Sequence, residues 1–100
     1  MSDLTKLSDS EVRRRMQAIP AWEVKEGRLV RTFEFADFVA AFAFMAAVAL
    51  IAERMEHHPN WSNAYNRVEI ALNTHDVGGI SSNDFELAER IDRVAQASAS

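Results

Sequence analysis

The chain has 100 residues, of which 48% are hydrophobic and 26% charged, and its formal net charge is −4. This is the length of one domain, and the composition is too apolar for a disordered chain. The acidic balance removes the electrostatic attraction behind most nucleic-acid binding. The absence of cysteine excludes disulfide bonds, thiolate catalysis and cysteine-ligated zinc. We therefore expect one globular domain over residues 1–100, with no nucleic-acid partner.

The chain shows no clear sign of a membrane segment or of export. Its longest uncharged apolar run, residues 38–52, has 15 residues, whereas a membrane-spanning helix needs about 20. The first ten residues are polar and lack the apolar centre of a signal peptide. We therefore expect a cytoplasmic protein without a membrane partner.

The first expected elements are a helix and a β-hairpin. Ser8 is a candidate N-cap, and Glu11 stands three residues later, as in a capping box. Pro20 ends this helix because it lacks an N–H and its ring is not tolerated further in. Residues 22–35 then alternate apolar and polar side chains on both sides of a turn at residues 26–27, which indicates two antiparallel strands.

A long helix is expected from Asp37, a candidate N-cap, to about Met55. Helical spacing places one apolar set toward the core and a second apolar set on the opposite face. The first set is Phe38, Phe42, Met45, Val48, Ala49 and Ala52, and the second is Val39, Ala43, Phe44, Ala47, Leu50 and Ile51. A helix that is apolar all round is buried all round. We therefore expect a homo-oligomer whose contact includes the 37–55 helix; the alternative is an alanine-rich face that tolerates exposure.

The second half repeats the order of strand, strand and helix. Pro59 ends the long helix, and residues 68–72 alternate as in a half-buried strand, with residues 62–66 as the hairpin partner. Ser81 or Ser82 then caps a last helix. Its buried stripe is Phe85, Ala88, Ile91 and Val94. The order α-β-β-α-β-β-α predicts an α+β two-layer domain, with a four-stranded antiparallel sheet and three helices on one face.

All three histidines lie within 19 residues, His57 and His58 in EHHPNW and His75 in NTHD. In an antiparallel hairpin the start of the first strand lies beside the end of the second. The two histidine segments should therefore meet at one edge of the sheet, where Trp61 offers a flat apolar wall. Imidazole gives and takes protons near neutral pH. This arrangement suits proton transfer on a flat heterocycle.

Carboxylates near the histidines can raise an imidazole pKa and fix its tautomer, and the candidates are Asp76, Glu56 and Glu53. Two other interpretations remain open. A histidine at a helix end is commonly a cap or a surface residue. Three histidines can also bind zinc with one open position, but adjacent residues seldom point at one ion, and the HExxH signature is absent. We expect no metal.

Three segments carry a resemblance to a known family: FAFMAAVALIAERMEHHPNW, YNRVEIALNTHD and SSNDFELAERID. Together they resemble the pterin-4a-carbinolamine dehydratases, most specifically over residues 42–92. The resemblance implies loss of water from 4a-hydroxytetrahydropterin to give quinonoid dihydropterin, which regenerates the pterin of aromatic amino acid hydroxylases. It implies no cofactor, since the pterin is the substrate, and it implies dimers or tetramers.

The resemblance also implies a set of site residues. The catalytic positions are His57, His58 and His75, and the substrate-binding positions are Glu53, Glu56, Pro59, Trp61, Asn73, Thr74 and Asp76. Asn73 departs from the serine of some members, which would alter a hydrogen bond at the pterin edge. Animal relatives also bind a transcription factor as a dimerisation cofactor, and some members belong to molybdopterin-related metabolism. The alternative is therefore a non-catalytic module that handles pterins or binds a protein.

Overall fold

The structure, a computed structural model, describes residues 4–99, with side chains described up to residue 97. The ends of the expected 1–100 domain, residues 1–3 and 100, lie outside this range. The elements are α1 (Asp9–Arg15), the 3-10 turn η1 (Met16–Ala18), β1 (Glu23–Lys25), β2 (Arg28–Glu34), α2 (Phe38–Met55), β3 (Asn60–Ala64), β4 (Arg67–Leu72), the 3-10 turn η2 (His75–Val77) and α3 (Ser82–Ala99). This order confirms the expected α-β-β-α-β-β-α arrangement.

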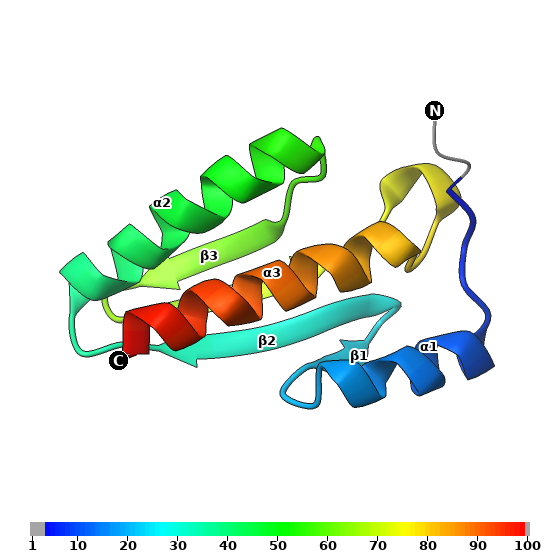
Figure 1. Cartoon of the computed structure of the whole chain (residues 1–100), viewed down its shortest axis with the longest axis horizontal. Helices are drawn as coiled ribbons and strands as arrows, with labels where there is room; N and C mark the ends of the chain where they lie inside the picture. The colour runs from blue at the N-terminus through cyan, green and yellow to red at the C-terminus, as the bar shows by residue number, and fades with distance from the viewer. Residues whose placement is uncertain (1–3, 100) are drawn as a thin grey trace.

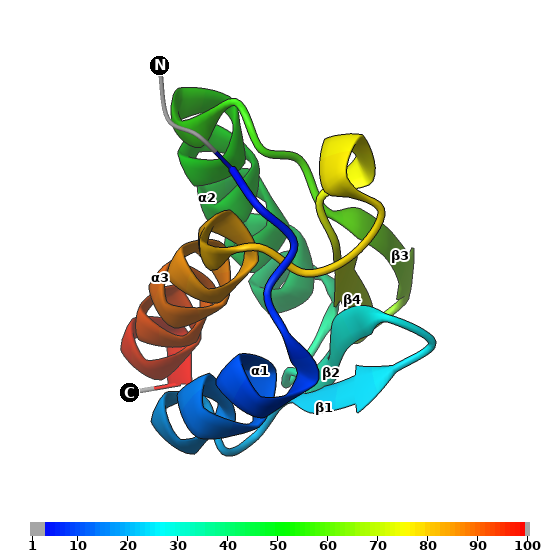
Figure 2. The same ribbon diagram turned by 90° about the vertical axis from the view of Figure 1, so that its right-hand side faces the viewer.

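The four strands form one antiparallel sheet in the order β1-β2-β4-β3. All three helices cover one face of it, as Figures 1 and 2 show. Along β4 the side chains of Val68, Ile70 and Leu72 are buried beneath the helices, whereas Arg67 and Glu69 are exposed on the open face. Successive side chains of a strand point to opposite faces of the sheet, and in β4 the apolar ones all point into the core. The two-layer α+β class is confirmed.

The hairpin that leads to the candidate site was expected to turn near Asn66 and Arg67, and the structure places the turn one residue earlier. Ala64 pairs with Arg67, so that the turn consists of Tyr65 and Asn66, and Tyr65 has a φ of 52°. The strand therefore covers Asn60–Ala64 rather than residues 62–66. The amide of Asn66 donates to the carbonyl oxygen of Phe35 at 2.9 Å, which ties the turn to the end of β2.

The core-facing side of α2 also differs from the expected one. The buried residues are Ala41, Phe44, Val48 and Ala52, whereas Phe38 and Phe42 are 44% and 56% exposed. The buried face takes Val48 and Ala52 from the first expected set and Phe44 from the second, so that the expected division of the helix into two faces is wrong. The sequence alone could not choose between the faces, because an all-apolar helix offers no polar side to contrast with the buried one.

The outward side of α2 is apolar. Its exposed large side chains are Phe38, Val39, Phe42 and Leu50. We call these four residues the outward stripe. The 18-residue helix is long and apolar enough to cross a membrane by length and composition alone, and 22% of it is buried in the protein. A core helix passes the same test, and the buried side of α2 packs against α3 and β4.

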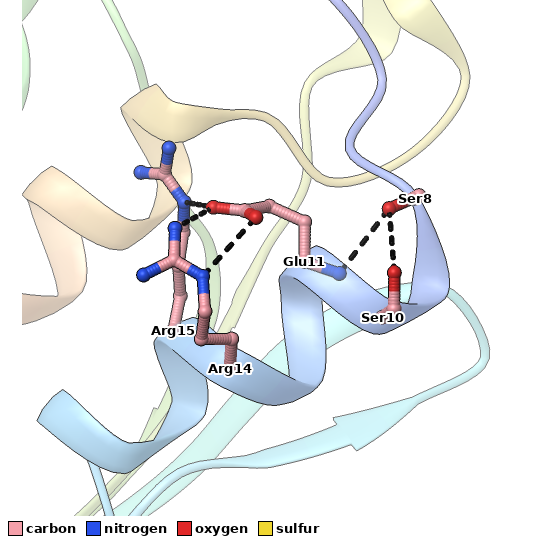
Figure 3. Close-up of polar contacts among 5 residues, drawn as sticks. All are labelled: Ser8, Ser10, Glu11, Arg14 and Arg15. Carbon is pink, nitrogen blue, oxygen red and sulfur yellow. Dashed lines mark hydrogen bonds and ion pairs between the residues drawn. The ribbon is translucent and has the colours of Figure 1, made fainter.

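The start of α1 confirms its expected N-cap (Figure 3). The Ser8 hydroxyl accepts the backbone N–H of Glu11 at 3.2 Å. The Glu11 carboxylate, however, pairs with Arg14 and Arg15 rather than completing a capping box. These hydrogen bonds, from Arg14 first and then from Arg15, lower the pKa of Glu11 below its ordinary value.

Candidate active site

The register of the second hairpin brings the two histidine segments to one edge of the sheet. Asn60, the first residue of β3, pairs with Ala71 near the end of β4. The side-chain amide of Asn60 also donates to Asn73 Oδ1 at 3.3 Å. The chain just before β3 carries His57, and the chain just after β4 carries His75. The segments therefore lie side by side, as the hairpin argument predicts.

The position of His57 follows from how α2 ends. Glu56 adopts the left-handed conformation with a φ of 52°, as residues at helix C-termini commonly do. The N–H of His57 still donates to the carbonyl oxygen of Ala52 at 3.0 Å. The left-handed residue turns the chain, and His57 reaches the beginning of α3.

His57 contacts a carboxylate that has no exposed surface. Its Nε2 lies 2.5 Å from Oδ1 of Asp84, and Asp84 is 0% exposed. The other oxygen of Asp84 accepts the Thr74 hydroxyl at 2.8 Å and the Ser81 N–H at 2.9 Å. The hydroxyls of Thr74 and Ser81 are themselves 2.5 Å apart. Burial of a carboxylate is costly unless it is paired and hydrogen-bonded, and these donors meet that condition.

The start of α3 explains how the sequence places this carboxylate. Ser81 precedes α3, and its hydroxyl accepts the N–H of Asn83 at 3.3 Å. Asp84, three residues later, accepts the backbone N–H of Ser81 in return. Ser81 and Asp84 thus form a reciprocal capping box in which an aspartate stands at the third helical position. The helix dipole also favours a negative charge there.

This arrangement leaves one nitrogen of His57 for chemistry. When the Asp84 carboxylate is ionised it only accepts hydrogen bonds, and Nε2 of His57 then carries the proton between the two groups. Nδ1 is then the ring nitrogen that can take up or release a proton. A carboxylate hydrogen-bonded to an imidazole fixes the tautomer and the orientation of the ring.

The other two histidines are more open. His58 Nε2 lies 2.9 Å from Oε1 of Glu53, and the two side chains are 62% and 79% exposed. His57 and His58 therefore turn to different carboxylates, as expected for adjacent residues. His75 is exposed at the start of η2, with exposed Asp76 beside it. No cluster of metal-binding side chains is found within residues 4–99.

Trp61 and Pro59 lie at the same edge, and both are half-buried. Trp61 packs against the hydrophobic core from the edge strand β3. It also lines a cavity of about 270 Å³ with Asn60, Ser62 and residues of β2 and β4. No histidine lines this cavity.

Asp84 and Ser81 are the site residues that sequence reasoning missed. Ser81 was considered only as a helix cap, and Asp84 was not considered. The S-x-x-D spacing of Ser81 and Asp84 was the available signal. It is an ordinary helix start, however, and nothing in the sequence shows that this carboxylate would be buried against His57.

The fold and the site together define a class: small α+β proteins in which a helix-capping carboxylate holds a histidine at the edge of a four-stranded sheet. The family model described as pterin 4 alpha carbinolamine dehydratase matches residues 5–94. The chain therefore belongs to the pterin-4a-carbinolamine dehydratase family.

Individual relatives agree with this assignment. A protein of Solibacter usitatus is 52% identical over 91 residues, which cover 91% of this chain and 96% of the relative. One of a Synechococcus strain is 56% identical over 86 residues, with 86% and 92% covered. Both carry the name pterin-4-alpha-carbinolamine dehydratase as a provisional assignment.

Two solved structures resemble this fold. The crystal structure of a transcriptional coactivator/pterin dehydratase from Brucella melitensis has a TM-score of 0.87 at 41% identity, covering 91% of this chain and 99% of the other. A pterin dehydratase-like protein identified as a RuBisCO assembly factor in the alpha-carboxysome has a TM-score of 0.62 at 27% identity, with 74% and 86% covered.

Proposed function

We propose that this protein is a hydro-lyase that removes water from a 4a-hydroxytetrahydropterin and gives the quinonoid dihydropterin. The observation that carries the proposal is the buried carboxylate of Asp84 held 2.5 Å from Nε2 of His57. This pair supplies an oriented imidazole at the edge where the second histidine segment also lies. The reaction needs proton transfers and no redox change, which this set of side chains can provide.

The reaction has two proton steps. The C4a–O bond of the substrate breaks, and a protonated imidazole, that of His57 or His58, gives its proton to the departing hydroxyl, which leaves as water. The electrons of the neighbouring ring N–H bond form the C4a=N bond, and His75 helps to remove that proton or positions the ring. Each such transfer is typically worth about 10² to 10⁴ in rate. Two acids on two sides of the ring would serve both 4a epimers.

Different residues hold the substrate and the catalytic groups. Asp76 is exposed and can accept hydrogen bonds from the amide and amino edge of a pterin. Thr74 is 4% exposed, and its hydroxyl contacts Ser81 and Asp84. Its backbone N–H donates to Gly79 at 2.7 Å. We therefore assign Thr74 to the support of Asp84 and assign contact with the pterin to Asp76.

The activity is tested with freshly made 4a-carbinolamine, whose loss of water is followed by absorbance with and without the protein. We expect the protein to accelerate the change catalytically and to saturate with substrate. Pterin binding without turnover would contradict the proposal and would indicate a pterin-handling protein instead.

A protein-binding role is the second candidate, and the outward stripe of α2 favours it. One related structure is described as a transcriptional coactivator/pterin dehydratase, and another as a RuBisCO assembly factor. We propose that in this protein the stripe is covered by further copies of the chain, in a dimer or tetramer. Co-purification of a different protein through the stripe, with no dehydration activity, would favour the second candidate.

The proposed setting is tetrahydropterin recycling in the cytoplasm. The support for this setting is the reaction itself, whose quinonoid dihydropterin product is the form that a reductase can use. Measuring the dehydration rate for pterins with different side chains identifies the physiological substrate by its kcat/KM.

A further inference from the structure

We propose that residues 4–7, which we call the N-terminal strap, are a positioning element for the Asp84–His57 pair. The strap crosses the loop of residues 74–81, which we call the site loop, just before that loop enters α3, as Figure 2 shows. In Figure 1 the strap runs beside the same loop. The catalytic part of this inference rests on the proposed function. The structural part does not.

The first contact is a backbone hydrogen bond. The N–H of Leu7 donates to the carbonyl oxygen of Ile80 at 2.8 Å. The next residue, Ser81, donates its own N–H to Asp84 Oδ2. The peptide unit between Ile80 and Ser81 therefore links the strap to the buried carboxylate: its oxygen binds Leu7 and its N–H binds Asp84. Displacement of Ile80 would move the Ser81 donor directly.

The second contact is made by the side-chain methylenes of Lys6, which lie over Gly79. A Cβ placed on Gly79 would lie 2.8 Å from Cε, 3.0 Å from Cγ and 3.1 Å from Cδ of Lys6. The lysine methylenes thus occupy the space that any larger residue at position 79 would need. Gly79 in turn accepts the N–H of Thr74 at 2.7 Å, and the Thr74 hydroxyl donates to Asp84. Lys6 therefore covers the backbone pair that fixes Thr74.

The strap is well placed to restrain the site loop because the middle of that loop is exposed. A cavity of about 150 Å³ lies between the strap, the β1–β2 turn and Gly78–Ile80. His75 and Asp76 of the same loop are exposed. Exposed segments of a loop open more readily than its buried ends. A small misplacement of a catalytic group can be costly, since about 1 Å can cost on the order of 10²-fold in rate.

Lys6→Ala and Leu7→Pro test the proposal in the full chain. Lys6→Ala removes the covering methylenes, and Lys25→Ala, at an exposed lysine of β1, is its control. Leu7→Pro removes the N–H donor, and Leu7→Ala, which keeps the donor and loses the side chain, is its control. Lys6 is exposed, so that its variant should fold even where a proline at position 7 does not.

Amide hydrogen exchange is the first readout, and it does not depend on activity. We expect the amides of Ser81 and Thr74 to exchange about fivefold faster in Lys6→Ala and Leu7→Pro than in their controls. In Leu7→Pro this is the effect of losing about one hydrogen bond, and in Lys6→Ala it follows from exposing the backbone pair of Thr74 and Gly79 to water. The amide of Ile70, in the middle of the sheet, should be unchanged. Unchanged exchange at Ser81 and Thr74 in both variants would overturn the proposal. Equal acceleration at Ile70 would also overturn it, because the effect would then be a general loss of stability.

Dehydration kinetics is the second readout. We expect kcat to fall about fivefold in the same two variants, with little change in KM, because the strap acts on the acid–base pair rather than on the substrate contacts. Faster exchange with an unchanged kcat would show that the strap does not position the catalytic pair. If the wild-type protein has no dehydration activity, the proposed function fails, and the exchange experiment still decides whether the strap holds the site loop.

Discussion

At the scale of single residues, the site depends on one carboxylate that serves two purposes. Asp84 caps α3 through Ser81 and fixes the ring of His57. Stability and catalysis are therefore linked at this position. A substitution of Asp84 that lowers the stability should therefore lower the activity as well. Substitutions of the exposed carboxylates nearby should not show this link.

Asp84→Asn should lower both the dehydration rate and the stability. The amide has one accepting oxygen where the carboxylate has two, and it lacks the negative charge of the carboxylate. We expect the rate to fall about 10²-fold and the free energy of unfolding to fall by about 1–3 kcal/mol. Stopped-flow absorbance and urea unfolding measure the two effects. Glu86→Gln, at an exposed carboxylate of α3, is the control, and equal behaviour of the two variants would contradict the role of Asp84.

The two adjacent histidines should differ sharply in their effect on stability. His57→Ala leaves the buried Asp84 carboxylate without its ring partner, and we expect a loss of about 1–3 kcal/mol in the free energy of unfolding. His58→Ala breaks an exposed pair with Glu53, and its effect should stay within about 0.5 kcal/mol. Urea denaturation of both variants gives the comparison. Losses of similar size would argue against a buried pair at His57.

At the scale of the elements, the ends of helices and strands do most of the positioning. The left-handed Glu56 aims His57, the Tyr65–Asn66 turn sets the hairpin register, and the capping box at Ser81 places Asp84. Each is a local feature of a few residues. Together they bring side chains from α2, β4 and α3 to one edge of the sheet.

The start of α1 offers a pH test of such a local feature. The pKa of Glu11 is lowered in the folded protein by its hydrogen bonds to Arg14 and then to Arg15 (Figure 3). A lowered pKa contributes stability above the ordinary value of 4.5, and that contribution is lost as the pH falls through the folded pKa. We expect Glu11→Gln to be slightly less stable than the wild type at pH 7, with the difference closing below pH 4.5. Thermal unfolding across this range measures it, and a difference that widens in acid would contradict the assignment.

The sequence was a good guide to the elements and a poor guide to their contacts. Three predictions had local physical causes, and all three are confirmed. They are the strand predicted from alternating apolar and polar side chains in residues 68–72, and the helix N-caps at Ser8 and Asp37. The buried face of α2 could not be chosen, because apolar residues surround the helix. The pairing of Asp84 with His57 joins residues 27 positions apart and depends on how α3 packs beside the end of α2, which no short segment encodes.

At the scale of the whole molecule, the two-layer fold leaves the outward stripe of α2 without cover. Phe38, Val39, Phe42 and Leu50 are between 44% and 74% exposed. Contiguous apolar surface on a small protein commonly marks an interface. A charge placed within such an interface should oppose assembly, because it would be buried without a partner.

Leu50→Glu tests the expected homo-oligomer. We expect the wild type to sediment as a dimer or tetramer, and the variant to shift toward the monomer mass of 11.3 kDa. Thr32→Glu, at an exposed position of β2 on the open face of the sheet, serves as the control and should keep the wild-type mass. Analytical ultracentrifugation gives the masses, and a monomeric wild type would contradict the expectation.

The most direct test of the account is the dehydration rate of the variants His57→Ala and His75→Ala, measured on freshly prepared 4a-carbinolamine under single-turnover conditions. Both residues come from the two chain segments that the second hairpin brings together. If these imidazoles transfer the protons, each variant should be slower than the wild type by about 10²-fold or more, while folding and pterin binding persist. Undiminished rates in both variants would show that water is not eliminated at this edge of the sheet.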